Sequence, residues 1–152
     1  MTTLSSIAAK DIGLCEAPRG TNKGPALKKF FQATDLDEPD GYPWCAAAVS
    51  YWVQQWIKVN GSKIKPPRIA GVVFFRDWAK KNGLKISTTP TPNSIVVFTF
   101  SHIGVVESTQ GGSITTIEGN TNDGGSREGY AVFRKKRPLS ECRLFIQLPA
   151  VG

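Results

Sequence analysis

The chain has 152 residues, of which 40% are hydrophobic and 20% are charged, and its formal net charge is +7. This composition excludes a disordered or fibrous chain and predicts one soluble globular domain over residues 1–152. A chain of this length buries about 70% of the surface that its unfolded form exposes, so its core needs no metal or disulfide to be stable.

The number of cysteines is three, and an odd number rules out a closed set of disulfides. No CxxC or His-rich spacing indicates zinc, so we expect neither a metal nor another cofactor. No apolar run approaches the roughly 18 residues that cross a membrane, and the first ten residues lack the pattern of a signal peptide. One alternative stays open, a calcium loop built from the acidic residues Asp35, Asp37, Glu38 and Asp40.

The excess of 19 Lys and Arg over 12 Asp and Glu predicts attraction to polyanions such as nucleic acid, anionic membranes or bacterial wall polymers. The basic residues are scattered, and no recognised nucleic-acid motif is visible. A basic surface can also serve solubility alone. Charge therefore does not choose the partner.

The first half of the chain predicts three helices. The first covers 24–33, where apolar residues recur at helical spacing after a proline suited to a first turn. The strongest follows Pro43 and ends at Asn60-Gly61, and a third covers about 71–81. The strongest helix carries an apolar stripe at i, i+3, i+4 and i+7: Val49, Trp52, Val53 and Trp56.

The second half predicts short strands, because its segments are rich in Val, Ile, Thr and Phe and are separated by Gly, Asn, Ser or Pro. Helices first and strands afterwards predict an α+β fold with an antiparallel sheet rather than a parallel βαβ fold. The expected strands are 94–100, 102–107, 113–118, 130–135 and 143–148.

Cys45 lies at the opening turn of the strongest predicted helix, in the segment Tyr42-Pro-Trp-Cys-Ala-Ala-Ala. The N-terminus of a helix carries a partial positive charge and favours the thiolate form of a cysteine placed there. Cys45 is therefore a candidate nucleophile. The alternative is a small buried residue that only packs in the core.

His102 is the single histidine of the chain and starts a predicted strand. It is the one candidate for a general base of the usual kind at neutral pH, although a lone histidine can be an ordinary polar residue. Strand alternation puts His102, Gly104 and Val106 on one face, where Gly104 would leave space beside the imidazole.

A third group must hold the imidazole in its productive tautomer. Glu118 and Asn120 end the next predicted strand and, being two residues apart, should share a face. A hairpin across Gly111-Gly112 would bring Glu118 near His102. The alternative is an acidic strand end followed by a turn asparagine. Glu107 is a weaker candidate, because alternation puts it on the opposite face from His102.

Three motifs in order carry a family resemblance: Tyr42-Pro-Trp-Cys45-Ala-Ala, Ser101-His102-Ile-Gly-Val-Val and Ile117-Glu118-Gly-Asn120. Together they resemble the CHAP domains, the cysteine, histidine-dependent amidohydrolases/peptidases within the NlpC/P60-like, papain-related group. The resemblance spans most of the chain, from about residue 20 to 133. It implies a papain-like α+β fold in which N-terminal helices pack on a C-terminal antiparallel sheet.

The resemblance also implies roles for single residues. Cys45 would be the nucleophile, His102 the base, Glu118 the residue that orients it, and Asn120 a further polar group that supports the site or the oxyanion. Side chains that flank these residues, and that either line the substrate groove or pack in the core, are Tyr42, Trp44 and Ser101.

In this family the bond cut is usually an amide of bacterial peptidoglycan, either the N-acetylmuramoyl-L-alanine bond or one in the stem peptide or cross-bridge. The resemblance implies a phage endolysin released by a holin, or an antibacterial effector delivered by a secretion system. Either would be made in the cytoplasm and act as a monomer in the periplasm or cell wall. Two alternatives stay open: a basic non-catalytic module that binds wall polymer or nucleic acid, and a thiol hydrolase that acts on proteins.

Overall fold

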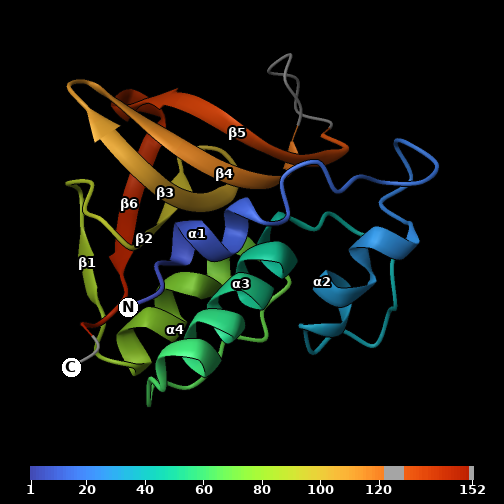
Figure 1. Ribbon diagram of the computed structural model, residues 1–152, viewed down its shortest axis with the longest axis horizontal. Helices are drawn as coiled ribbons and strands as arrows, with labels where there is room; N and C mark the ends of the chain where they lie inside the picture. The colour runs from blue at the N-terminus through green and yellow to red at the C-terminus, as the bar shows by residue number, and fades with distance from the viewer. Residues whose placement is uncertain (122–128, 151–152) are drawn as a thin grey trace.

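The computed structural model describes residues 1–121 and 129–150. Its α-helices all precede the six strands of its sheet along the chain (Figure 1). The helices are α1 Leu4–Ala9, α2 Lys28–Gln32, α3 Cys45–Asn60 and α4 Phe75–Lys81. The strands are β1 Lys85–Ser87, β2 Ser94–Phe98, β3 Ile103–Gln110, β4 Ser113–Thr121, β5 Ala131–Pro138 and β6 Cys142–Gln147.

Helix α3 forms where its apolar stripe predicts it. The four stripe residues are fully buried, and α3 stops at Gly61, whose φ of 66° is a left-handed conformation that glycine adopts without strain. The predicted helices at 24–33 and 71–81 are also confirmed, each opening with a 3₁₀ turn, Pro25–Leu27 and Val72–Phe74.

Two elements were not predicted, because both are short. Helix α1 has six residues, and its N-cap is Thr3, whose side chain accepts a hydrogen bond from the Ser6 backbone N–H. Strand β1 has three residues and pairs with β6 at one edge of the sheet. Neither is long enough to show a clear hydrophobic period.

The sheet is antiparallel throughout, with strand order β1-β6-β2-β3-β4-β5. The predicted hairpin between β3 and β4 is present. Gln110 pairs with Ser113 across a two-residue turn in which Gly111 has a φ of 58°. This turn sets the register that carries the end of β4 back beside the start of β3.

Helices α1, α3 and α4 cover one face of the sheet (Figure 1). The main core lies between these helices and the sheet and includes Ile103, Val105 and Ile117 from the sheet. A second, smaller cluster joins Val96, Phe98, Val106, Ile114 and Phe145. The α+β prediction, with helices packed on a mostly C-terminal antiparallel sheet, is confirmed.

Within the described ranges, 1–121 and 129–150, no helix is both long enough and apolar enough to cross a membrane.

Candidate active site

Cys45 is the first residue of α3, with Trp44 as the N-cap. The residues that follow, Ala46, Ala47 and Ala48, are small and buried, so the start of the helix can pack closely against the sheet. The first backbone N–H groups of a helix have no carbonyl partner within that helix, and they carry its partial positive charge. The sulfur of Cys45 therefore lies beside donors suited to an anion. Cys45 as a whole is 6% exposed.

His102 ends the short connection from β2 to β3 and is 8% exposed. Two backbone hydrogen bonds stabilise this connection: the Phe98 N–H donates to the His102 carbonyl, and the His102 N–H donates to the Phe100 carbonyl. The imidazole stacks on both phenyl rings, with centroids 5.5 Å from Phe98 and 5.8 Å from Phe100. The ring of His102 is thus held in one plane by its own turn.

Glu118 lies next to His102, as the hairpin predicts. The distance between His102 Nε2 and Glu118 Oε1 is 2.7 Å, and the Glu118 side chain has no exposed surface. The Thr116 hydroxyl donates to Oε2, and Arg137 grips both oxygens at 2.9 Å from Nε and 2.7 Å from Nη2. The Glu118 carboxylate is surrounded by donors, which satisfies a buried charge.

Burial is the largest single influence on the pKa values of Glu118 and His102, and it disfavours the charged form of each. The hydrogen bonds and charges of their partners together outweigh it. Burial raises the pKa of Glu118, whereas hydrogen bonds from Arg137 and His102 and their charges lower it, to about 2. Burial lowers the pKa of His102, whereas hydrogen bonds and charges from Cys45 and Glu118 raise it to about 9. Cys45 and His102 are therefore close enough to interact directly.

These ionisation states fix the direction of the hydrogen bond between the imidazole and the carboxylate. A carboxylate with a pKa of about 2 carries no proton at neutral pH, so Nε2 of His102 must be the donor toward Glu118. Nδ1 is the ring nitrogen left to face the thiol. Cys45, His102 and Glu118 thus form one chain of contacts from the start of α3, through the connection before β3, to β4, an arrangement that a nucleophile, its base and an orienting group require.

Gly104 has a different use from the one its position suggests. A Cβ at Gly104 would lie 2.8 Å from Cγ of Glu118, closer than real Cβ contacts come. The lack of a side chain at Gly104 therefore makes room for Glu118, which binds His102, rather than for the imidazole itself. Gly119 has the same kind of role toward the helix, since a Cβ there would lie 2.8 Å from the Trp44 ring and 2.9 Å from Ala48.

Asn120 lies within a stretch where the pairing between β4 and β5 is interrupted. The register between β4 and β5 shifts between Glu118 and Thr121, and Asn120 has a φ of 54°. The simple alternation that predicts a shared face for Glu118 and Asn120 is interrupted here. Asn120 is half-buried at the end of β4, two residues from the glutamate.

The sequence matches the family model of the CHAP domain over residues 37–120. The chain belongs to the CHAP domain family. The matched part of this CHAP domain contains Cys45, His102 and Glu118 and ends at Asn120. No curated protein has significant sequence similarity to the chain.

Two solved structures share the fold of this CHAP domain, "The crystal structure of Ly7917" and "The crystal structure of Ly7917 with the hydrolyzing product of MDP". The TM-scores are 0.51 and 0.53 at 15% and 16% sequence identity, over 95% and 96% of this chain. The match covers 61% of each Ly7917 chain, so the present chain spans about three fifths of its length. At this identity the likeness is one of fold.

The three predicted groove residues have different surroundings. Ser101 is exposed beside His102. Tyr42 is half-buried, with its ring edge on Phe31 and its hydroxyl 3.0 Å from that of Thr34, and burial raises its pKa. Trp44 has no exposed surface, which fits the packing alternative rather than a groove wall.

The buried Trp44 anchors the start of α3. Its indole N–H donates to Glu16 Oε2 at 2.8 Å, and the other oxygen of Glu16 accepts from the Gly20 N–H at 2.7 Å. The indole also stacks on Phe30, with centroids 5.7 Å apart. Residues far back in the chain thereby fix the turn that presents Cys45.

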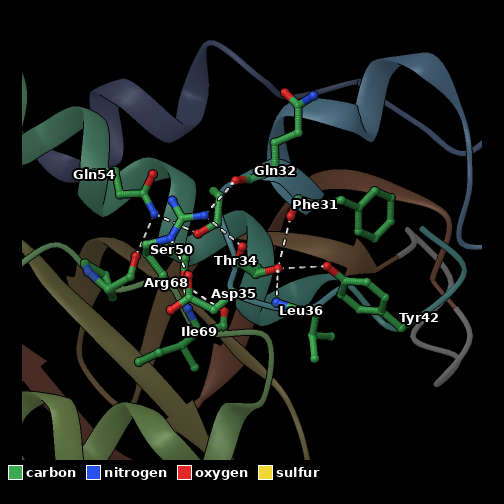
Figure 2. Close-up of polar contacts among 12 residues, drawn as sticks. Phe31, Gln32, Thr34, Asp35, Leu36, Tyr42, Ser50, Gln54, Arg68 and Ile69 are labelled. Atoms are coloured by element: carbon green, nitrogen blue, oxygen red, sulfur yellow. Dashed lines mark hydrogen bonds and ion pairs between the residues drawn. The ribbon is translucent and has the colours of Figure 1, made fainter. Parts of the chain in front are cut away.

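A polar clamp holds the segment that enters α3 (Figure 2). Arg68 donates to Asp35 Oδ1 at 2.6 Å and to the carbonyls of Gln32 and Thr34. From α3, Gln54 donates to the carbonyls of Ala33 and Pro67. The segment between α2 and Cys45 is therefore tied to α3, the helix that it precedes. Among the described residues, no three His, Cys, Asp or Glu side chains gather as a metal site would require.

Sequence reasoning missed three polar residues around the site: Thr116, Arg137 and Glu16. Arg137 lies in a run of basic residues that reads as a solvated surface, yet its side chain is 14% exposed and binds Glu118. Its guanidinium also lies 5.0 Å from the Phe98 ring and 5.4 Å from the Phe100 ring. The one signal for it was strand alternation in β5, which places every second residue of that run on the less exposed face of the sheet.

Proposed function

We propose that this protein is a peptidoglycan hydrolase that cuts an amide bond with Cys45 as nucleophile and His102 as base. The observation that carries the proposal is the chain of contacts from Cys45 through His102 to Glu118. Membership of the CHAP family supports an amidohydrolase. The shared fold with Ly7917, whose structure is described with the hydrolyzing product of MDP, supports a wall substrate.

The first step is attack by the Cys45 sulfur on the amide carbonyl carbon. At neutral pH the raised pKa of His102 keeps the imidazole protonated, and an imidazolium beside the sulfur stabilises its thiolate. The sulfur forms a bond to carbon while the carbonyl π electrons move to oxygen. Backbone N–H groups at the start of α3 donate to that oxyanion.

The second step expels the amine. The tetrahedral carbon re-forms its carbonyl, the C–N bond breaks, and the imidazolium gives its proton to the departing nitrogen. Neutral His102 then takes a proton from water, which attacks the thioester and releases the acid and the thiolate. Glu118 keeps the imidazole oriented throughout, and Asn120 is proposed to support the site or the oxyanion from the end of β4.

Tyr42 and Ser101 are proposed to contact substrate, since both keep some exposed surface beside the reacting groups. The bond is either the N-acetylmuramoyl-L-alanine amide or one in the stem peptide or cross-bridge. The net charge of +7 suits an anionic wall. The site of action would be the periplasm or cell wall, where this substrate lies, in a phage endolysin or a delivered antibacterial effector.

Purified Gram-negative sacculi test the proposal. Wild-type protein should release soluble fragments whose masses identify the bond, and the Cys45→Ala variant should release none under the same reducing conditions. Equal thermal melting temperatures (Tm) for the two proteins exclude unfolding as the cause. Release by the alanine variant would contradict the cysteine mechanism.

The same samples separate the alternatives. A basic binding module would release nothing, and its binding to polyanions would weaken steeply as salt rises. A thiol hydrolase of another specificity would cleave a generic protein substrate, lose that activity in Cys45→Ala and leave sacculi intact.

A further inference from the structure

A pocket of about 360 Å³ lies beside the candidate active site. The connection between β2 and β3 forms one wall with Thr99, Phe100 and Ser101, and α4 and β6 contribute Arg76 and Arg143. Its apolar lining includes Val97 and Leu144. The volume is at the lower end of the roughly 300–1,000 Å³ of small-ligand pockets, which suits one or two residues of a larger substrate.

The two arginines give the pocket a positive charge that nothing nearby neutralises. Both side chains are exposed, and neither pairs with a carboxylate among the residues that the structure describes. Arg143 makes one long contact, 3.4 Å from Nη2 to the Thr99 carbonyl. Most of the guanidinium donors in this pocket are therefore available to an anionic ligand.

The pocket borders the base directly. Ser101 precedes His102 in the chain, and the Phe100 ring that lines the pocket stacks on the imidazole at a centroid distance of 5.8 Å. A substrate whose amide reaches Cys45 and His102 would extend a neighbouring residue toward this pocket. That adjacency makes the pocket a part of substrate recognition rather than a separate site.

We propose that this pocket binds a carboxylate-bearing residue of the peptide part of the substrate. Arg76 and Arg143 would bind the carboxylate, and the aliphatic part of that residue would pack on Val97 and Leu144. The mixed lining favours an acidic amino acid over a phosphate polymer, because a sugar-phosphate chain offers nothing to the apolar wall. This inference rests on the proposed function and specifies which substrate chemistry the site selects.

A pair of synthetic N-acetylmuramoyl dipeptides tests the proposal by binding. One ends in an acidic residue with free carboxylates, and the other carries carboxamides at the same positions. The Cys45→Ala protein should bind the acid roughly tenfold more tightly than the amide in calorimetry, because charge-assisted hydrogen bonds are lost in the amide. Adding Arg76→Gln and Arg143→Gln should reduce the preference to less than about twofold.

A matched control removes the same charge elsewhere. Lys58 and Lys63 are exposed near the far end of α3, so Lys58→Gln with Lys63→Gln should keep the preference. Equal loss in the lysine and arginine variants would overturn the proposal, because it would show a general charge effect. Displacement of the acid by linear polyphosphate, with tighter binding of polyphosphate that depends on the arginines, would also overturn it.

Hydrolysis assays separate this inference from the proposed function. In protein with Cys45 intact, the arginine variants should raise KM for the acid substrate with little change in kcat, since they remove binding remote from the reacting atoms. Hydrolysis without any preference for the acid would overturn the pocket proposal and leave the hydrolase standing. An arginine-dependent binding preference without hydrolysis of either dipeptide or of sacculi would do the reverse.

Discussion

The two sides of the candidate site are built differently. On the helix side, Cys45 is the first residue of a single element, α3, and the three residues that follow it are small. On the sheet side, His102 directly precedes β3, Glu118 lies in β4 and Arg137 in β5, and they meet only because those strands pair in one register. The start of one helix presents the candidate nucleophile, whereas strand register brings the candidate base and its support together.

The buried acids sharpen this contrast. Glu16, beside the helices, accepts from the Trp44 indole and the Gly20 backbone N–H, which are neutral donors, and so fastens elements together. Glu118, in the sheet, accepts from His102 and Arg137, both of which carry charge. The first kind of contact positions the scaffold, and the second sets the ionisation of His102.

The largest effect should follow from Glu118→Gln. An amide has one NH₂ group where the carboxylate has an acceptor, so a donor would face a donor at His102 or at Arg137. We expect a loss of kcat on sacculi on the order of 10²- to 10⁴-fold, with little change in KM. A loss below about threefold would contradict the role of Glu118.

Arg137→Met tests the support of the sheet side. It leaves a fully buried carboxylate without its strongest donor, and breaking a buried pair costs about 3 kcal/mol of the free energy of unfolding. The pKa of Glu118 is lowered from 4.5 to about 2, so the stability it contributes is present above 4.5 and lost as pH falls toward 2. Urea unfolding should therefore show a larger difference from wild type at pH 7 than near pH 2, and an equal difference at both would contradict this.

Because the chain has a single histidine, NMR can measure the interaction between Cys45 on the helix side and His102 on the sheet side. The raised pKa predicts that His102 titrates near pH 9 and that Cys45→Ala lowers this value, because burial remains while the contact with sulfur is lost. The linked stability is fully present below the unfolded value of 6.5 and is lost as pH rises through about 9. An unchanged titration in Cys45→Ala would show that the two side chains do not interact.

Gly104→Ala tests close approach between β3 and the glutamate on β4. The added methyl would lie 2.8 Å from Glu118 Cγ, so we expect a loss of about 1–3 kcal/mol in the free energy of unfolding, with reduced activity. Gly112→Ala is the control, because a Cβ there meets nothing within 4 Å. Equal effects of the two substitutions would rule out the crowding mechanism.

The smallest effect should come from Glu107→Gln. Glu107 accepts from Arg134 at 2.6 and 2.9 Å, but the Arg134 side chain is 51% exposed, and such surface pairs contribute less than about 1 kcal/mol. Activity on sacculi should stay within about twofold of wild type. A loss like that of Glu118→Gln would move the orienting role to Glu107.

The sequence by itself determined the longer elements and the proximity of Glu118 to His102. Apolar periods of 3.6 and 2 predict the long helix and most strands, and the Gly111-Gly112 turn predicts the hairpin that brings Glu118 to His102. These features are readable because each depends on residues close together in the chain.

Only the tertiary structure decided what surrounds those groups. Arg137 reaches Glu118 from another strand across 19 residues, and Glu16 reaches Trp44 across 28. The bulge after Glu118 interrupts the alternation that places Asn120, and the arginine pocket joins α4 to β6. Contacts between residues so far apart leave no periodic signal, because they depend on register and packing, which no local stretch of sequence encodes.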